Sequence, residues 1–193
     1  MKQLYISDTH FGHANCLHFD ARPFRDVTHQ EEEMIERWNR AVNVEDHVYI
    51  LGDFCWQKED EWARLLNLLN GQKTLILGNH DVIPCKTRRL FADVKEMKTI
   101  EDNGRKVVLC HYPSPCYKNH FYGWYHLYGH VHTSFEWNMM EHHRYLCEEL
   151  YTRPCEMYNV GAMLPYMNYT PRTLDEIIIG YKEMKQNEIK QTV

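Results

Sequence analysis

The feature that most constrains the fold is an alternation of short apolar runs with amphipathic helical segments in the first eighty residues. Residues 3–8, 46–53 and 73–81 each begin as an apolar stretch and end in polar residues, as buried strands do. Between them, residues 31–42 and 59–71 carry apolar side chains at helical spacing. This order of strands and helices predicts right-handed crossovers and a largely parallel sheet.

After residue 93 the strands no longer alternate regularly with helices. Residues 94–111 predict two strands around an Asp-Asn-Gly turn, which is a strong hairpin signal. Two further strands are predicted within residues 124–132 and 157–162, and residues 173–186 predict a helix or a strand that passes into a helix. We find no internal repeat or linker, so residues 1–193 are expected to form a single α/β domain.

Composition excludes several classes of protein. Hydrophobic residues make up 44% and charged residues 25%, with a formal net charge of -5 and no lysine- or arginine-rich run. Bulk nucleic-acid binding and attachment to an anionic membrane are therefore not expected. No apolar stretch approaches the roughly 18 residues of a spanning helix. The seven scattered cysteines form no CxxC pair, which argues against a disulfide framework and predicts a cytoplasmic protein.

Polar side chains of particular types follow the ends of the predicted strands. Ligands of open α/β sheets gather beyond the carboxyl ends of the strands, so these side chains are expected to share one site. Imidazole and carboxylate groups together suit zinc, iron or manganese, whereas calcium or magnesium sites are nearly all oxygen. The candidate metal ligands are Asp8, His10, Asp53, Asn79, His111, His130 and His132.

The charges of this set also point to a substrate. Two metal ions about 3.5–4 Å apart need a bridging carboxylate, and Asp53 is the natural bridge. Asp8 and Asp53 leave two cations with residual positive charge, and the neutral amide of Asn79 does not cancel it. That surplus matches an anionic phosphoryl group.

Each motif taken alone has a more ordinary interpretation. A DxH or GD sequence is usually a polar strand end, and an isolated histidine such as His111 is more often structural. All of the motifs in this order, each after a predicted strand, form a much more specific pattern.

That pattern, DTH, GD, GNHD, a histidine and GHVH, resembles the calcineurin-like metallophosphoesterases. The stretches SDTHFGHAN, RPF and LGDF are similar to small bacterial and phage phosphoesterases of that superfamily. The resemblance implies a four-layer αββα sandwich with mixed sheets and a dinuclear site at the carboxyl ends of the strands. It assigns one metal to Asp8, His10, Asp53 and His132, and the other to Asp53, Asn79, His111 and His130.

The activity implied is hydrolysis of a phosphoester, with a metal-bridging hydroxide attacking phosphorus. We expect manganese, iron or zinc as the cofactor and a phosphodiester or nucleotide as the substrate. The alternatives are a phosphomonoesterase acting on a small metabolite or phosphoprotein, and a non-enzymatic metal-bearing scaffold that binds a protein. His80 is expected to protonate the leaving oxygen, with Asp81 orienting its imidazole.

Other residues carry weaker predictions. His13 and Asn15 follow the DTH motif closely enough to contact substrate, although loop polarity alone would explain them. Arg22 suits phosphate through its guanidinium, and a surface salt bridge explains it equally well. Residues 133–158 have no counterpart in the family pattern, and the spacing of His142, His143 and Cys147 there predicts a solvated helix face rather than a further metal site.

Overall fold

The computed structural model describes residues 1–83 and 85–192 and contains two four-stranded sheets. The first sheet has the order β1 (Gln3–Ile6), β2 (His47–Ile50), β3 (Gln72–Ile76) and β4 (Asp93–Lys95), all parallel. Its crossovers carry α1 (Cys16–Phe19), α2 (Val27–Ala41), α3 (Glu59–Leu68) and the short 3₁₀ turn η1 (Thr87–Leu90). The parallel sheet predicted from the alternation is therefore confirmed.

The second sheet is mixed. Its order is β5 (Met97–Asp102), β6 (Arg105–Cys110), β7 (Tyr125–Tyr128) and β8 (Met157–Asn159). The pair β5–β6 is antiparallel around the predicted turn, where Asn103 and Gly104 both have positive φ, while β6–β7 and β7–β8 are parallel. The 3₁₀ turn η2 (His120–Tyr122) precedes β7, and α4 (Phe135–Tyr145) and the π-helical turn η3 (Leu146–Leu150) precede β8. The chain ends in α5 (Leu174–Thr192).

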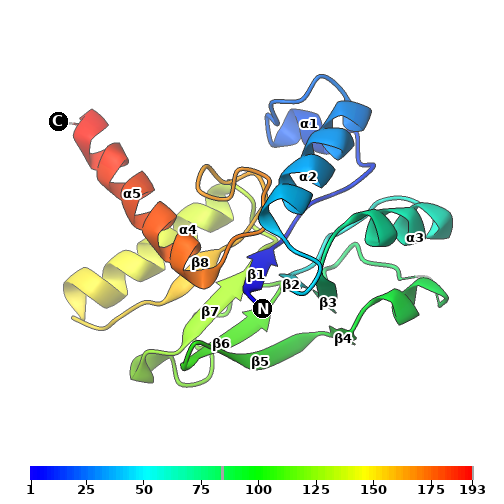
Figure 1. Ribbon diagram of the computed structural model, residues 1–193. Helices are drawn as coiled ribbons and strands as arrows, with labels where there is room; N and C mark the ends of the chain where they lie inside the picture. Colours follow the sequence, from blue (N-terminus) through cyan, green and yellow to red (C-terminus); the bar gives the residue numbers. More distant parts are fainter. Residues whose placement is uncertain (84, 193) are drawn as a thin grey trace.

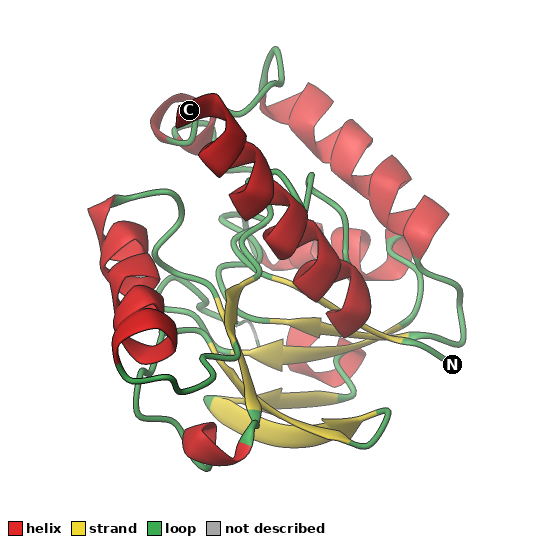
Figure 2. Cartoon of the chain, turned by 90° about the vertical axis from the view of Figure 1, so that its left-hand side faces the viewer, coloured by secondary structure: helices red, strands yellow, loops and turns green. Residues whose placement is uncertain are grey.

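Helices cover both outer sides of the paired sheets, as the two views show (Figures 1 and 2). Apolar residues of α2 and α3, such as Trp38 and Trp62, join a core that continues through the first sheet to Val107 and Leu109 of β6. On the opposite face of β6, Val108 belongs to a second cluster that packs against α4. These two clusters confirm the four-layer αββα arrangement.

Backbone hydrogen bonds join the two sheets at the edge where the predicted metal ligands lie. Just beyond β1, the Ser7 amide donates to the Val160 carbonyl at 2.9 Å, and the Ala162 amide donates to the Ser7 carbonyl at 2.9 Å. The chain segments that follow β1 and β8 are thereby aligned side by side. As a result, the carboxyl ends of β1, β2 and β3 meet those of β6 and β7.

Candidate metal centre

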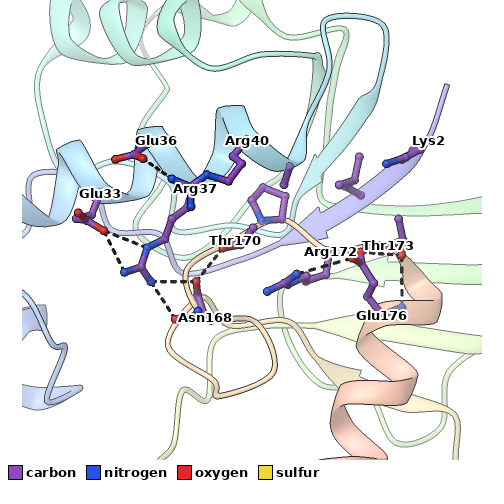
Figure 3. Close-up of a pocket in the computed structure, with 13 residues that line it drawn as sticks. Lys2, Glu33, Glu36, Arg37, Arg40, Asn168, Thr170, Arg172, Thr173 and Glu176 are labelled. Atoms are coloured by element: carbon purple, nitrogen blue, oxygen red, sulfur yellow. Dashed lines mark hydrogen bonds and ion pairs between the residues drawn. The ribbon is translucent and has the colours of Figure 1, made fainter.

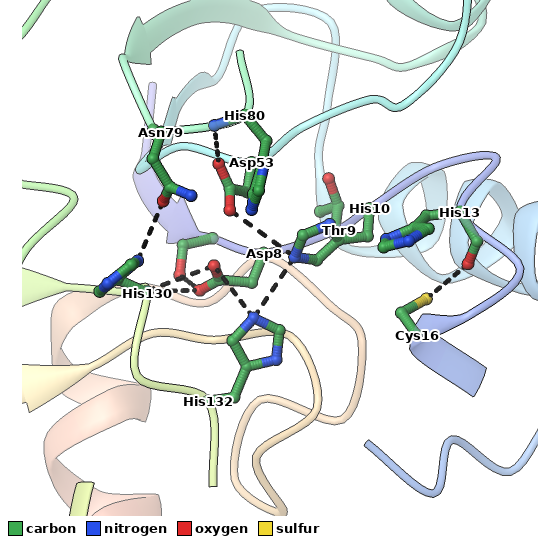
Figure 4. A network of polar contacts seen from close by, with 12 residues as sticks. Asp8, Thr9, His10, His13, Cys16, Asp53, Asn79, His80, His130 and His132 are labelled. Carbon is green, nitrogen blue, oxygen red and sulfur yellow. Dashed lines mark hydrogen bonds and ion pairs between the residues drawn. The ribbon is translucent and has the colours of Figure 1, made fainter. Parts of the chain in front are cut away.

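The predicted ligands lie together at these strand ends (Figure 4). One nitrogen or oxygen from each of Asp8, His10 and His132 lies within 4.8 Å of the others, and the same holds for Asp8, Asp53 and His111. Asp8 and Asp53 are 0% and 4% exposed. The structure thus brings two groups of metal-binding side chains to one place from four different strand ends.

Asp53 lies between the two groups. Its Oδ2 atom is 3.8 Å from His10 Nε2 and 3.7 Å from His111 Nε2. Its Oδ1 atom accepts a hydrogen bond of 3.0 Å from the His80 amide, which leaves Oδ2 to face both imidazoles. One carboxylate oxygen therefore reaches both halves of the candidate site.

Asn79 completes the second half of the set. Its Oδ1 atom lies 3.1 Å from His111 Nε2 and 3.0 Å from His130 Nδ1. The Asp8 carboxylate is held differently, because Oδ2 accepts from the Ser7 hydroxyl at 2.5 Å and from the His130 amide at 3.1 Å. Asp8 Oδ1 remains directed at His132 Nε2, 3.6 Å away.

The hydrogen bonds around the imidazoles show that the donor set fits a cation. His111 Nδ1 donates to the Leu51 carbonyl at 2.7 Å, and His132 Nδ1 donates to Asp20 at 2.7 Å. In each neutral ring the Nε2 atom then carries a lone pair and no proton. These two lone pairs face the oxygens of Asn79 and Asp8, so electron-rich atoms point at one another where a metal ion would satisfy them. Nitrogen and oxygen ligands of this kind fit manganese, iron or zinc.

The electrostatic environments of His10 and Asp53 favour a bound cation. Burial lowers the pKa of His10 to about 2, and the nearby charges of Arg22 and His132 act in the same direction. A ligating histidine must be neutral, and His10 meets that condition throughout the physiological range. Burial raises the pKa of Asp53, and the neighbouring Asp8 carboxylate adds to the rise although the charge of His111 opposes it. A bound cation would relieve the repulsion between the two carboxylates.

The backbone at the site is strained. Positive φ is uncommon for a residue other than glycine, and such conformations cluster at functional sites. Five of the seven predicted ligands adopt it, with φ between 46° and 70°: Asp8, His10, Asp53, His130 and His132. The fold holds these residues in an uncommon backbone conformation, and their side chains meet at the candidate site.

A buried arginine supports this strained backbone. The sequence predicts a substrate contact for Arg22, but the structure corrects that prediction because Arg22 is 4% exposed. Its guanidinium donates to the carbonyls of Asp8 and Thr9, each at 2.9 Å, and to Asp20 at 2.9 Å. Arg22 therefore fixes the chain between two ligands. Asp20, which links Arg22 to His132, was not singled out by its sequence context.

Asp81 also has a role different from the predicted one. Its carboxylate accepts hydrogen bonds from the amides of Asp53, Phe54 and Gly78, each at 2.9 Å. Three backbone donors occupy the group that was expected to orient the imidazole of His80. Asp81 instead ties the loop after β3 to the loop after β2, and so positions Asp53 relative to Asn79.

The exposed side of the site is lined by aromatic rings. The His13 ring stacks on Trp56 with centroids 4.1 Å apart and planes at 7°, and the His80 ring lies 4.5 Å from Trp56 on centroids. His80 is exposed, as is Asn15 at the start of α1. Phe19 is 57% exposed and contacts the His10 and His132 rings. Trp56 and Phe19 lack a recognisable motif, and the sequence offers no signal for either.

A small pocket lies at the candidate site, and a larger one lies away from it. A pocket of about 320 Å³ adjoins the candidate site and is lined in part by Phe19, His130 and His132. A larger one, of about 870 Å³, lies between α2 and residues 168–176, away from the strand ends (Figure 3). Its charged groups have partners within the pocket: Arg37 forms an ion pair with Glu33 and donates a hydrogen bond to Asn168. Only the smaller pocket is placed to receive a molecule beside the metal ligands.

The chain is similar to several known proteins. An uncharacterised protein of Methanocaldococcus jannaschii is 33% identical over 196 residues, covering 100% of this chain and 97% of that protein. The gene 66 protein of Mycobacterium phage D29 is 38% identical over 81 residues, or 40% of this chain and 39% of its own length. A solved protein of unknown function from Aquifex aeolicus has the same fold, with a TM-score of 0.66 at 24% identity over 99% of this chain and 98% of that one.

A family model gives the assignment. The model of the calcineurin-like phosphoesterase superfamily domain matches residues 1–147, which contain all seven predicted ligands. Those residues include both sheets up to β7 and the loops that follow their strands. The chain therefore belongs to the calcineurin-like phosphoesterase superfamily.

Proposed function

We propose that this phosphoesterase works with two metal ions that share the Asp53 carboxylate. The observation that supports it is the position of Asp53 Oδ2, within 4 Å of the Nε2 atoms of both His10 and His111. The ions are drawn from manganese, iron and zinc. One ion is assigned to Asp8, His10, Asp53 and His132, and the other to Asp53, Asn79, His111 and His130.

The proposed reaction is hydrolysis at phosphorus. Bound metal ions supply a water activated near neutral pH and a clamp for the phosphoryl oxygens. His80 is the proposed general acid for the leaving oxygen, which such a group accelerates by about 10²–10⁴-fold. Its amide is anchored on Asp53 Oδ1 and its ring contacts Trp56. These contacts hold the imidazole at the open side of the metal ligands, where a substrate would arrive.

We further propose a phosphodiester or nucleotide substrate. Trp56 and Phe19 are 46% and 57% exposed, and both contact the His10 ring. Base stacking on an exposed aromatic ring is worth about 1–3 kcal/mol. His13, stacked on Trp56, and the exposed Asn15 remain proposed substrate contacts. A small phosphoester with an attached ring would then span the metal ligands and the aromatic side chains.

The test combines metal content with a substrate panel. Purified protein is analysed for metals and assayed with manganese on matched mono- and diesters that release the same aromatic alcohol. The proposal requires about two metals per chain in this centre, counted apart from any ion bound by cysteines, together with preferential diester cleavage. Asp53→Asn should lose metal from this centre and turnover together. Asp60→Asn, an exposed change in α3, is the matched control.

Each other outcome favours a named alternative. Faster cleavage of the monoester would favour the phosphomonoesterase. A fully loaded centre that cleaves no member of the panel would favour a protein-binding scaffold. Two metals retained in this centre of Asp53→Asn, apart from any ion bound by cysteines, would contradict the shared carboxylate.

The proposed setting is the cytoplasm. All seven cysteines are free thiols, as expected of a reducing compartment, and the net charge of -5 gives no general attraction to nucleic acid. Within residues 1–83 and 85–192, no helix is both long and apolar enough to cross a bilayer.

A further inference from the structure

A second group of metal-binding side chains lies at the far end of α4. This helix begins shortly after His132, and the nine steps from Ser134 to His143 advance about 14 Å along its axis at 1.5 Å per residue. In Figure 1, α4 extends away from the first sheet toward the side of the molecule that carries the start of β8. The group is therefore separate from the candidate phosphoester centre.

The group consists of one histidine and two cysteines. A ring nitrogen of His143 and the Sγ atoms of Cys147 and Cys155 all lie within 4.8 Å of one another. His143 Nε2 is 3.6 Å from Cys147 Sγ. Tetrahedral zinc, with bonds of about 2.3 Å to sulfur and 2.0 Å to nitrogen, separates its ligand atoms by roughly 3.5–3.8 Å. The observed spacing requires little movement to surround such an ion.

The backbone places these ligands in a specific way. His143 and Cys147 are four residues apart, which puts them on one face of a helix. The turn that carries Cys147 is π-helical, over Leu146–Leu150, and such turns occur frequently at functional sites. Cys155 lies in the loop between η3 and β8. The three ligands thus join the end of a helix to the loop that enters β8.

The surroundings suit a bound metal. Cys155 is 6% exposed and, with Cys147, belongs to the apolar cluster on the outer face of the second sheet. The Arg144 guanidinium donates to the Cys155 and Met157 carbonyls, so a positive charge lies close to the buried sulfur. Burial raises the pKa of the Cys155 thiol to about 11 in the metal-free chain, although the charge of Arg144 opposes the rise. A bound cation would displace that proton.

His120 offers a fourth ligand. It lies in η2, and its Nδ1 donates to the Tyr117 carbonyl at 2.8 Å, which leaves Nε2 with a free lone pair. Its ring lies 5.6 Å on centroids from that of Tyr117, which belongs to the same apolar cluster as Cys155, although His120 is not part of the group of three within 4.8 Å. A fourth protein ligand closes the coordination sphere, which distinguishes a structural zinc site from a catalytic one.

We propose that His143, Cys147 and Cys155, with His120 as the fourth ligand, bind one structural zinc ion. Thiolate and imidazole ligands in a tetrahedral arrangement favour zinc over the other common divalent ions. The ion would fasten η3 to the segment entering β8 and thereby fix the outer end of α4. It takes no part in phosphoester cleavage.

Cobalt substitution isolates this site, because the described ligands of the phosphoester centre include no cysteine. Metal-free, reduced protein is titrated with Co²⁺ and followed through the near-ultraviolet thiolate-to-cobalt charge-transfer band. One equivalent should develop the band in the wild type and in Asp53→Asn. The band should be lost in Cys147→Ser and Cys155→Ser and weakened in His120→Ala, while Cys85→Ser, an exposed cysteine, should leave it intact.

Two further measurements keep the proposal testable if a cysteine variant fails to fold. Far-ultraviolet circular dichroism and phosphoester hydrolysis should match the wild type in Cys147→Ser when the phosphoester centre is loaded. In the Asp53→Asn background, one equivalent of zinc should raise Tm, as binding to the folded state requires. Absence of the band in reduced wild-type protein would overturn the proposal. So would a band that survives both cysteine substitutions, or a Tm that zinc leaves unchanged.

Discussion

Nδ1 of His132 donates a hydrogen bond of 2.7 Å to Oδ1 of Asp20, whose Oδ2 accepts from Arg22 Nε at 2.9 Å. Burial alone would raise the pKa of Asp20, but the hydrogen bond and charge of His132 and the charge of Arg22 bring it below the usual value. Asp20 is therefore an anion that fixes the His132 tautomer. Outer partners of this kind are worth about 10–100-fold in metal affinity or activity.

Asp20→Asn should weaken metal binding by about that factor, because the amide provides a weaker acceptor for the His132 Nδ1 proton. The measurement is competition of the purified protein against a chelator of known affinity. Asp60→Asn, on the exposed face of α3, should bind metal as the wild type does. Equal affinities for both variants would show that Asp20 does not support the ligand.

Gly129→Ala should damage the same region through steric overlap. A Cβ atom at residue 129 would lie 2.2 Å from Ser7 Oγ and 2.5 Å from Asp8 Oδ2, so the Asp8 carboxylate must move. We expect loss of metal from this variant in elemental analysis. Gly104→Ala is the control, since its Cβ meets nothing within 4 Å although its φ is +80°. It should cost about 1–2 kcal/mol of stability and keep its metal.

His80→Ala should keep its metal and lose about 10²–10⁴-fold in turnover, because it removes the proposed general acid while the backbone amide still donates to Asp53. Metal content and kcat are measured on one preparation. A substrate with a highly acidic leaving alcohol should be affected much less, since that leaving group needs no proton. An equal loss with both substrates would argue against proton donation by His80.

Trp56→Ala should raise KM for nucleotide substrates more than for a phosphoester without a ring. The expected effect is about 5–150-fold, the equivalent of about 1–3 kcal/mol of stacking. Phe19→Ala provides an independent measure on the other exposed ring. A uniform change in KM across both substrate types would mean that Trp56 supports His13 and His80 without contacting a base.

His126 gives a pH dependence that is independent of the metal ligands. Its Nδ1 donates to the Val108 carbonyl at 3.0 Å, and its Nε2 accepts from the Ser114 amide at 3.1 Å. Burial lowers the pKa of this neutral ring from 6.5 to about 4. Between these values the unfolded chain binds more protons, so the stability contributed by His126 is complete above pH 6.5 and is lost as pH falls toward 4.

The matched comparison uses urea unfolding of the wild type and His126→Gln. Between pH 7 and 4.5, the advantage of the wild type should shrink by about 2 kcal/mol, because glutamine does not titrate. Taking the difference between the two proteins removes the contribution of the other titrating groups. A difference that stays constant with pH would mean that folding leaves the pKa of the His126 ring unchanged.

Much of the fold follows from local patterns. The strands that end at Ile6, Ile50 and Ile76, and the hairpin at Asn103 and Gly104, were predictable because apolar runs and turn residues coincide there. Helix α2 begins earlier than the glutamate-rich run suggests, because Asp26 caps it by accepting from the His29 amide at 2.8 Å. β4 has only three residues, too short for a periodicity signal, and its separation from β5 depends on which sheet each strand joins.

The candidate site, like the fold, was predictable where local patterns determine it and unpredictable where tertiary contacts do. Its metal-binding residue types follow strand ends, where sequence and topology agree, and the structure brings them together. The contacts of Asp20, Arg22 and Asp81 depend on loop geometry that no local pattern encodes. The cluster of His143, Cys147 and Cys155 was missed for a related reason, since Cys155 reaches the helix only after the chain reverses direction.

The left-handed backbone conformation at Asp8, His10, Asp53, His130 and His132 narrows the choices open to anyone redesigning this centre. Aspartate, asparagine, histidine and glycine tolerate that conformation, while β-branched and bulky residues do not. A site for a different ion would have to use only these four residue types at the five positions, or it would need loops with a different backbone conformation. Glycine at any one of the five positions would relax the chain and erase a ligand in the same step.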